Sequence, residues 1–467
     1  MARVAFIQNF WYQYLGVMYI TSILKNENHS CEVFIQGGEK KLFDSVKKFN
    51  PDILGFYATT GNQKWILETC SRLKRELNCK VVLGGPHPTF FPEIIEDKNV
   101  DAICIGEGEY AMQEFCSRFD RGEPLRDIQN LWVKEDGNIY KNPLRPLIDD
   151  LDSLPFPDRS LYDKYPSLKD NLSVFTGRGC PFSCTFCYNK SYREIYSGKG
   201  KMIRRHSPEW IISELKRLKE KLDLKFVRFD DEVFIINPQW LDELLLLYKK
   251  EINLPFTCLL HVKLTKPDVI EKLKNAGCEM AYFGIETGDE ELRNKVLKKG
   301  FSNDEIIQAA RALKDKNIKI GTYNMLGIPG ETVEKAFKTI KLNQFIKTDF
   351  PWCSLFQPYP KTEIEEYCRK NKFLKEGYSC DDMSASFFKK CVVENKEKRE
   401  LENLQRFFHL AIKFPKLEPV IKLLIKFPSN IFFELIFYLT YGYRYIRTYR
   451  VSLYRIIITA LRSKEYL

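Results

Sequence analysis

Short apolar runs alternate with amphipathic stretches through the first part of the chain. Helical patterns separate β-rich runs at Val4–Gln8, Cys31–Ile35, Ile53–Tyr57, Lys80–Leu83 and Ala102–Ile105. This alternation predicts an α/β fold with a parallel, doubly wound, Rossmann-like sheet. A ligand of such a sheet binds beyond the carboxyl ends of its strands. The pattern fades after Glu123, which predicts a connector from that point.

A second series of strands and helices begins after a stretch rich in Pro and Asp, which is typical of an inter-domain linker. Strands are expected at Leu172–Gly177, Phe226–Asp230, Phe256–His261, Met280–Ile285, Lys319–Leu326 and Trp352–Pro358. Helical patterns such as Ser207–Leu222 and Asp304–Lys316 lie between them. Six parallel βα units predict a partial barrel, whose chemistry belongs at the carboxyl ends of its strands.

From about Phe373 the strand pattern ends, and the chain becomes helical, aromatic and basic. The sequence therefore predicts a Rossmann-like domain at 1–140, a linker at 141–170, a partial barrel at 171–372 and a helical region at 373–467. The N-terminus begins with a strand and lacks the charged-then-apolar layout of a signal peptide. We therefore expect a cytoplasmic protein.

The net charge of +11 is concentrated in the last segment. From Leu401 onward, eleven Lys and Arg stand against four Glu, interleaved with aromatic and aliphatic residues. This pattern suits a helix resting on anionic lipid at the inner membrane face, a cap packed against the barrel, or a plain helical lid with a solvated basic face. Glu434 interrupts an apolar run that is too short to span a bilayer. No recognition module accompanies the charge, so no nucleic-acid partner is expected.

The chain contains 14 cysteines, and a reducing cytoplasm disfavours a disulfide framework. Three of them, Cys180, Cys184 and Cys187, follow an expected barrel strand at spacings of four and three. Three thiolates on a four-iron cluster leave one iron free to chelate the amino and carboxylate groups of a small molecule. A zinc site is the alternative, but zinc takes a fourth nearby Cys or His, and His206 is distant in the chain. The remaining cysteines are expected to be small core residues: Cys31, Cys70, Cys79, Cys104, Cys116, Cys258, Cys278, Cys353, Cys368, Cys380 and Cys391.

The segment Cys180-Pro181-Phe182-Ser183-Cys184-Thr185-Phe186-Cys187 resembles the Cys-x-x-x-Cys-x-aromatic-Cys motif of radical S-adenosylmethionine (SAM) enzymes. The resemblance implies a [4Fe–4S] cluster on the three cysteines. In that family the reduced cluster cleaves SAM to methionine and a 5′-deoxyadenosyl radical, which abstracts hydrogen from the substrate. An external electron donor such as flavodoxin or ferredoxin, and anaerobic conditions, are also implied.

Other barrel segments resemble the SAM-binding elements of this family, in the same order along the chain. Phe229-Asp230-Asp231-Glu232 ends the second strand, where the resemblance implies that Asp230 and Asp231 bind the SAM amino group. Gly284-Ile285-Glu286-Thr287-Gly288 resembles the ribose-binding element, with Glu286 as the acceptor. The stretch that includes Gly327 resembles the segment near adenine, and Phe186 and Tyr188 are expected to pack against the same base.

Each of these residues also has a plain structural interpretation. Asp230 and Asp231 suit a solvated turn, Glu286 a surface ion pair, and Gly327 an ordinary turn. Their order and their places at strand ends favour SAM binding. Tyr359-Pro360-Lys361-Thr362 departs from the Tyr-Pro-Gly-Thr common in relatives, which leaves the turn geometry there open.

Gly84-Gly85-Pro86-His87-Pro88-Thr89 and Gly106-Glu107-Gly108-Glu109 resemble the cobalamin-binding domain that precedes the barrel in one radical SAM subgroup. A broad, flat corrin needs a close backbone approach, which Gly84 and Gly85 permit. The nucleotide tail is expected beside the sheet near Thr59, Thr60 and Gly106. The Asp-x-His-x-x-Gly element of many cobalamin proteins is missing after the first strand, which implies either cobalt without a protein imidazole below it or a domain that has lost the cofactor. His87 is interpreted as a turn residue.

The resemblance implies cobalamin-dependent methylation of an unactivated carbon, which many members of the subgroup catalyse. Others use the same domains for cyclisation or rearrangement, so a radical cyclase acting on a lipid or tetrapyrrole is the alternative. A non-catalytic cobalamin or redox sensor is a third alternative, against which Asp231 and Glu286 argue. The substrate is expected to be a small molecule or lipid, with peripheral membrane contact through the C-terminal region, and no motif identifies it.

Overall fold

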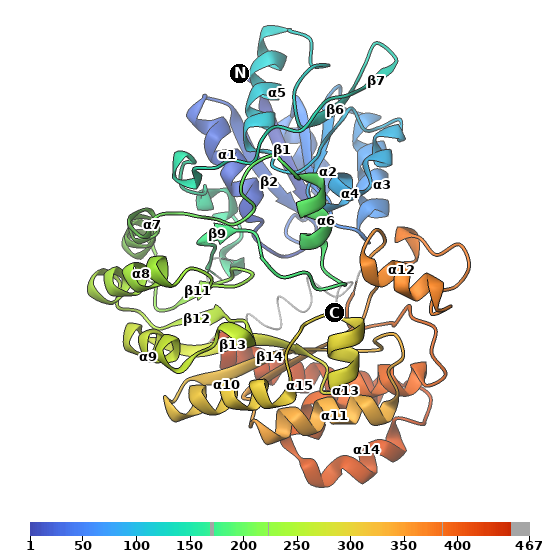
Figure 1. Ribbon diagram of the computed structural model, residues 1–467. Helices are drawn as coiled ribbons and strands as arrows, with labels where there is room; N and C mark the ends of the chain where they lie inside the picture. The colour runs from blue at the N-terminus through green and yellow to red at the C-terminus, as the bar shows by residue number, and fades with distance from the viewer. Residues whose placement is uncertain (169–171, 223, 385, 450–467) are drawn as a thin grey trace.

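The computed structural model describes residues 1–168, 172–222, 224–384 and 386–449. It contains two large sheets, and the N-terminal sheet lies above the barrel in Figure 1. The first sheet has the strand order β2-β1-β3-β4-β5-β6-β7. Its parallel strands are β1 (Arg3–Gln8), β2 (Ser30–Ile35), β3 (Ile53–Tyr57), β4 (Lys80–Gly84) and β5 (Ala102–Cys104).

Helices cover both faces of this sheet, because successive side chains of a strand point to opposite faces. Val4 and Phe6 of β1 join the core under α1 (Leu15–Asn26) and α5 (Glu109–Arg121). Ala5 and Ile7 join the core under α2 (Leu42–Phe49) and α3 (Gln63–Lys74). The expected doubly wound domain is confirmed.

An antiparallel hairpin extends the sheet where the sequence predicted only a connector. β6 (Leu131–Glu135) pairs with β5 and with β7 (Asn138–Lys141). Asp136 and Gly137 form the turn with φ of 52° and 76°, as an Asp-Gly hairpin turn requires. The expectation of a connector is therefore wrong for Leu131–Lys141. Apart from buried Leu131 and Val133, these strands carry partly or fully exposed side chains, so their apolar pattern is weak.

The second large sheet is a curved row of six parallel strands that confirms the partial barrel. From one edge to the other it consists of β15 (Phe350–Leu355), β14 (Lys319–Leu326), β13 (Cys278–Glu286), β12 (Phe256–Leu259), β11 (Val227–Phe229) and β8 (Ser173–Val174). The helices between them are α7 (Pro208–Lys221), α8 (Pro238–Glu251), α9 (Pro267–Ala276), α10 (Asn303–Asp315) and α11 (Val333–Phe345). Ser207 caps α7 by accepting from the Trp210 N–H at 3.1 Å.

The first barrel strand is shorter than expected from the run Leu172–Gly177. β8 ends at Val174, and the backbone N–H of Thr176 donates to the Asp231 carboxylate at 2.9 Å rather than to a neighbouring strand. β9 (Gly177–Arg178) then pairs antiparallel with β10 (Arg204–Arg205). The Asp231 side chain thus takes the place of a neighbouring strand as the hydrogen-bond acceptor for Thr176, and the chain leaves the sheet just before the cysteine loop.

The C-terminal region packs against the barrel. After the last barrel strand come α12 (Glu363–Lys370) and then the helices of this region, α13 (Lys398–Lys413), α14 (Glu418–Leu424) and α15 (Ile431–Tyr449). Leu404 and Phe407 of α13 share a core with Phe337 of α11 and Leu355 of β15, and the orange-red helices cover that side in Figure 1. No helix of the described residues is long and apolar enough to cross a bilayer. The basic residues Arg450, Arg455, Arg462 and Lys464 lie outside the described part of the chain.

Short helices complete the connections. They are α4 (Pro86–Phe90), α6 (Tyr188–Ile195), a π-helix at Leu292–Val296, and 3₁₀ turns at Pro92–Glu96, Leu151–Ser153, Arg159–Tyr162, Pro166–Leu168, Val262–Leu264, Cys380–Asp382 and Pro415–Leu417.

Candidate active site

One cavity of about 560 Å³ lies where the carboxyl ends of the two sheets face each other. Gly84, Gly85 and Gly106 line it from the first sheet. Tyr188 and Glu232 line it from the barrel. Three glycines expected near cobalamin therefore border the same space as Tyr188, which is expected to contact SAM.

A slot of this cavity runs into the first domain between the sheet and helices α1 and α5. Its walls include Phe6, Gly55, Val82, Val17 and Met112. An apolar slot beside a parallel sheet suits the flat, buried nucleotide tail of cobalamin. Thr59 is not among the described residues that line the cavity.

The glycines of the first sheet differ in what surrounds them. A Cβ on Gly84 would lie no closer than 3.8 Å to another atom, so this position is open toward the cavity. Gly85 has φ +97°, which L side chains rarely adopt. A Cβ on Gly106 would lie 1.8 Å from the Tyr196 hydroxyl, so Gly106 allows α6 to approach the loop. Gly84 thus borders open space. Gly85 instead permits a positive φ, and Gly106 permits close packing of Tyr196.

The loop after β1 supplies aromatic side chains where many cobalamin proteins have a histidine. Trp11, Tyr12 and Tyr14 line the cavity, and Tyr14 stacks on Tyr57 with ring centroids 4.3 Å apart. His87 lies behind this wall, hydrogen-bonded to Thr60 at 3.2 Å, and burial lowers its pKa to about 4. His87 lies in the short helix α4 and not in a plain turn, and its burial agrees with a structural role.

The cysteine loop is held by the barrel around it. Arg193 of α6 donates to the carbonyls of Cys180 and Phe182 at 2.7 and 3.0 Å. Thr185 is buried and donates through its hydroxyl to the Val296 carbonyl at 2.7 Å. Cys180, Cys184 and Cys187 are half-buried. Ten of the other cysteines are buried as expected, whereas Cys380 is also half-buried.

The surroundings of the three thiols suit ligands of an iron–sulfur cluster. The Phe182 backbone N–H donates to the Cys180 sulfur, and Asn189 donates to the Cys187 sulfur. Burial raises the pKa of Cys184 to about 11, and the Lys299 ammonium opposes this rise. Donors and a cation near thiolates are typical of cluster sites. Among the described residues, no three His, Cys, Asp or Glu side chains are placed to bind a single metal ion.

The three consecutive carboxylates after β11 point in different directions. Asp230 binds Arg228 at 2.8 Å and faces Tyr12. Asp231 is buried, with one oxygen bound to Thr176 and Arg205 and the other without a partner among the described residues. Glu232, by contrast, lines the cavity and is accessible from it.

The pKa values of these carboxylates follow their positions. Burial raises the pKa of Asp231 to about 6, against the lowering effect of Arg205. Desolvation by the surrounding protein also raises the pKa of Glu232, although its side chain is exposed to solvent. A carboxylate in such surroundings gains from a bound ammonium group.

Glu286 lies at a bulge of β13 and has φ 65°. Its carboxylate accepts from the Lys299 ammonium at 3.0 Å, and both side chains are about 10% exposed. Lys299 also lies within electrostatic range of Cys184 and Cys180. This pair therefore lies beside the cysteine loop.

Phe186, Tyr188 and Gly327 occupy three different places. Phe186 packs into the apolar cluster that contains Ile328 and Leu292. Tyr188 stacks on Phe90 of the first domain with centroids 4.2 Å apart. Gly327 faces the C-terminal region, where a Cβ would lie 2.6 Å from the Cys391 sulfur. The roles assigned to these residues stay predictions.

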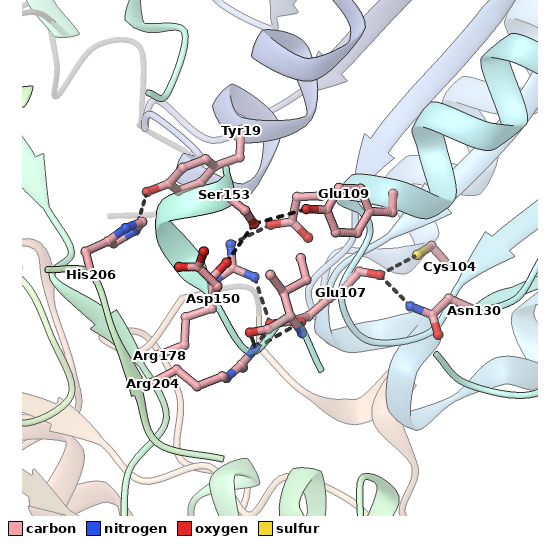
Figure 2. A network of polar contacts seen from close by, with 12 residues as sticks. Tyr19, Cys104, Glu107, Glu109, Asn130, Asp150, Ser153, Arg178, Arg204 and His206 are labelled. Carbon is pink, nitrogen blue, oxygen red and sulfur yellow. Dashed lines mark hydrogen bonds and ion pairs between the residues drawn. The ribbon is translucent and has the colours of Figure 1, made fainter. Parts of the chain in front are cut away.

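Ion pairs join the first domain to the β9–β10 pair beside the cavity (Figure 2). Arg178, two residues before Cys180, binds Glu107 at 2.8 Å and Glu109 at 2.6 Å. Arg204 binds Glu107 at 2.9 Å. Because Glu107 directly follows Gly106, these pairs tie the expected cobalamin loop to the segment that enters the cysteine loop.

Lys361 makes a second contact between the domains. It keeps φ 64°, so the turn retains a conformation that favours glycine. Its ammonium donates to the Phe90 carbonyl at 2.5 Å. The departure from Tyr-Pro-Gly-Thr thus adds a contact and preserves the turn.

Several of these residues were not identified from the sequence. Glu107, Glu109 and Arg178 stand in glycine-rich segments at strand ends, which is a usable signal for charged residues near a ligand. Arg204 and Lys299 lie in stretches without a motif. Only their tertiary partners identify them.

Comparison with known proteins agrees with this geometry. Residues 174–342 match the family model of the radical SAM superfamily, and residues 9–116 match that of the B12 binding domain. An uncharacterised methyltransferase of Pyrococcus horikoshii is 32% identical over 77% of this chain and 79% of its own. The chain belongs to the cobalamin-binding radical SAM enzymes. Its cofactors are therefore a [4Fe–4S] cluster, SAM and cobalamin.

Other similar proteins share less sequence identity with this chain. The anaerobic magnesium-protoporphyrin IX monomethyl ester cyclase of Rubrivivax gelatinosus is 24% identical over 74% of this chain and 65% of its own. The structure of OxsB, a cobalamin-dependent SAM radical enzyme, matches 99% of this chain and 75% of its own with a TM-score of 0.70 and 15% identity. The radical SAM methyltransferase TsrM of Kitasatospora setae gives a TM-score of 0.66 over 80% of this chain and 76% of its own, also at 15% identity. The two structures share the fold.

Arg178→Ala should lower the free energy of unfolding of this radical SAM protein by about 3 kcal/mol, because buried Glu109 would lose its partner and Glu107 would keep only Arg204. Arg121→Ala removes an exposed pair with Glu123 and should change it little. Urea denaturation of both variants measures the difference. Equal losses would mean that the buried pairs do not stabilise the interface.

Gly84→Val should abolish cobalamin uptake and leave the iron content unchanged. The first added carbon meets no clash, and the rest of the side chain projects toward the cavity. Visible absorption after incubation with hydroxocobalamin and an iron assay on the same sample measure both. Normal uptake would place the corrin elsewhere.

Proposed function

We propose that this protein transfers a methyl group to a carbon atom of a small-molecule or lipid substrate in a cobalamin-dependent radical SAM reaction. The observation that carries the proposal is the single cavity, bordered by the glycines of the first sheet and by the barrel residues next to the cysteine loop. Both cofactors need access to the same substrate carbon, and a shared cavity provides it. The methyltransferase relative at 32% identity supports methylation over the cyclase at 24%.

The chain's residues would bind and orient the reactants. Cys180, Cys184 and Cys187 would hold the cluster. Glu232 and the unpaired oxygen of Asp231 would bind the SAM ammonium. Asp230 is held by Arg228 and would influence the site only through its electrostatic interaction with Tyr12. When bound, the cluster supplies the electron that cleaves SAM, and cobalamin supplies the methyl group.

The positions of the remaining site residues in the fold suggest their roles. Glu286 would accept the ribose hydroxyls, kept in place by Lys299. Phe186, Tyr188 and Gly327 would border adenine. Gly84, Gly85 and Gly106 would allow the corrin to approach the first sheet, with the nucleotide tail in the apolar slot.

Anaerobic incubation with SAM carrying a deuterated methyl group tests the proposal. Reconstituted protein should hold about four iron and four sulfide, form 5′-deoxyadenosine under strong reductant, and transfer the labelled methyl to a candidate lipid or tetrapyrrole. Cys184→Ala should do none of these, whereas Cys380→Ala removes a half-buried cysteine outside the loop and should do all.

Three results would contradict the methyl-transfer proposal. Binding of one zinc and no iron would exclude the cluster. Formation of 5′-deoxyadenosine with an unlabelled, cyclised product would favour the cyclase alternative. Intact cofactors without any SAM cleavage would favour a sensor.

We further propose that an external flavodoxin or ferredoxin reduces the cluster, and that the C-terminal region contacts an anionic membrane. The membrane proposal rests on large apolar side chains exposed on α14, α15 and the turns beside them. These side chains form the C-terminal apolar face: Phe414, Leu417, Val420, Leu423, Phe427, Ile431, Phe432, Leu435, Tyr438, Leu439 and Tyr443. Exposed Lys416, Lys422 and Lys426 lie among them. Basic residues around exposed apolar groups are typical of interfacial helices.

The C-terminal apolar face should bind vesicles that contain phosphatidylglycerol and not vesicles of phosphatidylcholine alone. Each lysine near an anionic surface contributes roughly 1 kcal/mol, which salt screens. Co-sedimentation with anionic vesicles should weaken in the double variant Leu423→Ser, Phe432→Ser. The control variant Leu246→Ser should bind normally, because Leu246 is 72% exposed on α8, away from this face. These point variants leave α13, which packs into the core beside the barrel, in place. Equal binding to both vesicles, or to neither, would contradict membrane contact.

A further inference from the structure

A buried imidazole lies beneath the cysteine loop. His261 follows β12, and its ring stacks on Phe182 with centroids 3.5 Å apart and an interplanar angle of 5°. Phe182 lies midway between Cys180 and Cys184 in the chain. Phe301 closes the other side of the imidazole edge-on at 5.5 Å. The stack fixes His261 against the loop that carries the cluster ligands.

His261 lacks hydrogen-bond partners within the described part of the protein. Its side chain is 6% exposed, and neither ring nitrogen has a partner there. Buried polar groups nearly always form a hydrogen bond, and exceptions often mark a functional site. Its backbone carbonyl, by contrast, accepts from the Thr265 hydroxyl at 2.9 Å. Both ring nitrogens are therefore available for a hydrogen bond to a bound group.

The charges around His261 define that partner. Burial and the cations Lys299 and Lys263 lower its pKa to about 3, so the ring is neutral and carries one N–H donor. Lys299 also acts on Cys184 and Cys180. A donor in these cationic surroundings favours an anionic acceptor close to the cysteines. The Phe182 and Asn189 N–H groups already donate to thiol sulfurs of this loop.

We infer that His261 donates an N–H hydrogen bond to a sulfur of the cluster held by Cys180, Cys184 and Cys187. Such bonds stabilise the more negative, reduced state and raise the reduction potential of a cluster. His261 thus makes the cluster easier to reduce before SAM cleavage. The inference rests on the proposed cluster at these cysteines.

A potentiometric titration of the reconstituted cluster without SAM, followed by electron paramagnetic resonance, tests this role. His261→Phe keeps the stack and removes the donor, and should reduce the equilibrium constant for reduction about tenfold, which is 59 mV for a one-electron couple. His409→Phe is the matched control. His409 also lacks partners for both ring nitrogens among the described residues but lies in the C-terminal bundle, and this variant should leave the potential unchanged.

A second measurement uses the unaltered protein, so it does not depend on the folding of a variant. With ¹⁵N-labelled histidine, hyperfine spectroscopy of the reduced cluster should show a weak ¹⁵N coupling. An unchanged potential in His261→Phe, or no ¹⁵N coupling in the unaltered protein, would overturn the inference while the iron content stays at four. A change confined to SAM affinity would overturn it too, because the partner would then be SAM. Absence of iron would instead contradict the proposed function.

Discussion

The carboxylates of Glu107 and Glu109 pair with the guanidinium groups of Arg178 and Arg204 between the two domains, and all of these side chains except Arg178 are less than 10% exposed. Charges are expensive to bury unless their partners are in place, so this cluster allows one arrangement of the two domains. It also links the two cofactor regions, because Glu107 adjoins Gly106 and Arg178 lies two residues before Cys180. The distance between the cobalamin loop and the cysteine loop depends on these pairs.

The other contacts between the domains reinforce this arrangement. Lys361 binds the Phe90 carbonyl, and Tyr188 stacks on the Phe90 ring. Gln63 of the first domain donates to Asp381 of the C-terminal region at 3.0 Å. The C-terminal region thus touches the cobalamin domain and, through α13, covers the edge strand β15. An uncovered edge strand would offer unpaired backbone groups to other chains.

Local constraints made much of the site predictable. A short loop with three cysteines at fixed spacing has few alternative functions, and glycines at the ends of buried strands indicate close approach by a ligand. The carboxylates after β11 were less predictable. Asp230, Asp231 and Glu232 are consecutive, and their local sequence does not say which one is satisfied by Arg228, which by Arg205, and which faces the cavity. Those partners come from separate parts of the fold.

The sequence by itself determined the two α/β domains, the cysteine loop and the family, because periodicity and spacing are properties of short segments. It missed the hairpin β6–β7, whose Asp-Gly turn was visible but whose strands are largely exposed. Tertiary structure alone decided that Glu232 faces the cavity, that Lys299 pairs with Glu286, and that His261 lies under the cysteine loop. These outcomes depend on charges and rings brought together from distant residues, and no local pattern encodes such distances.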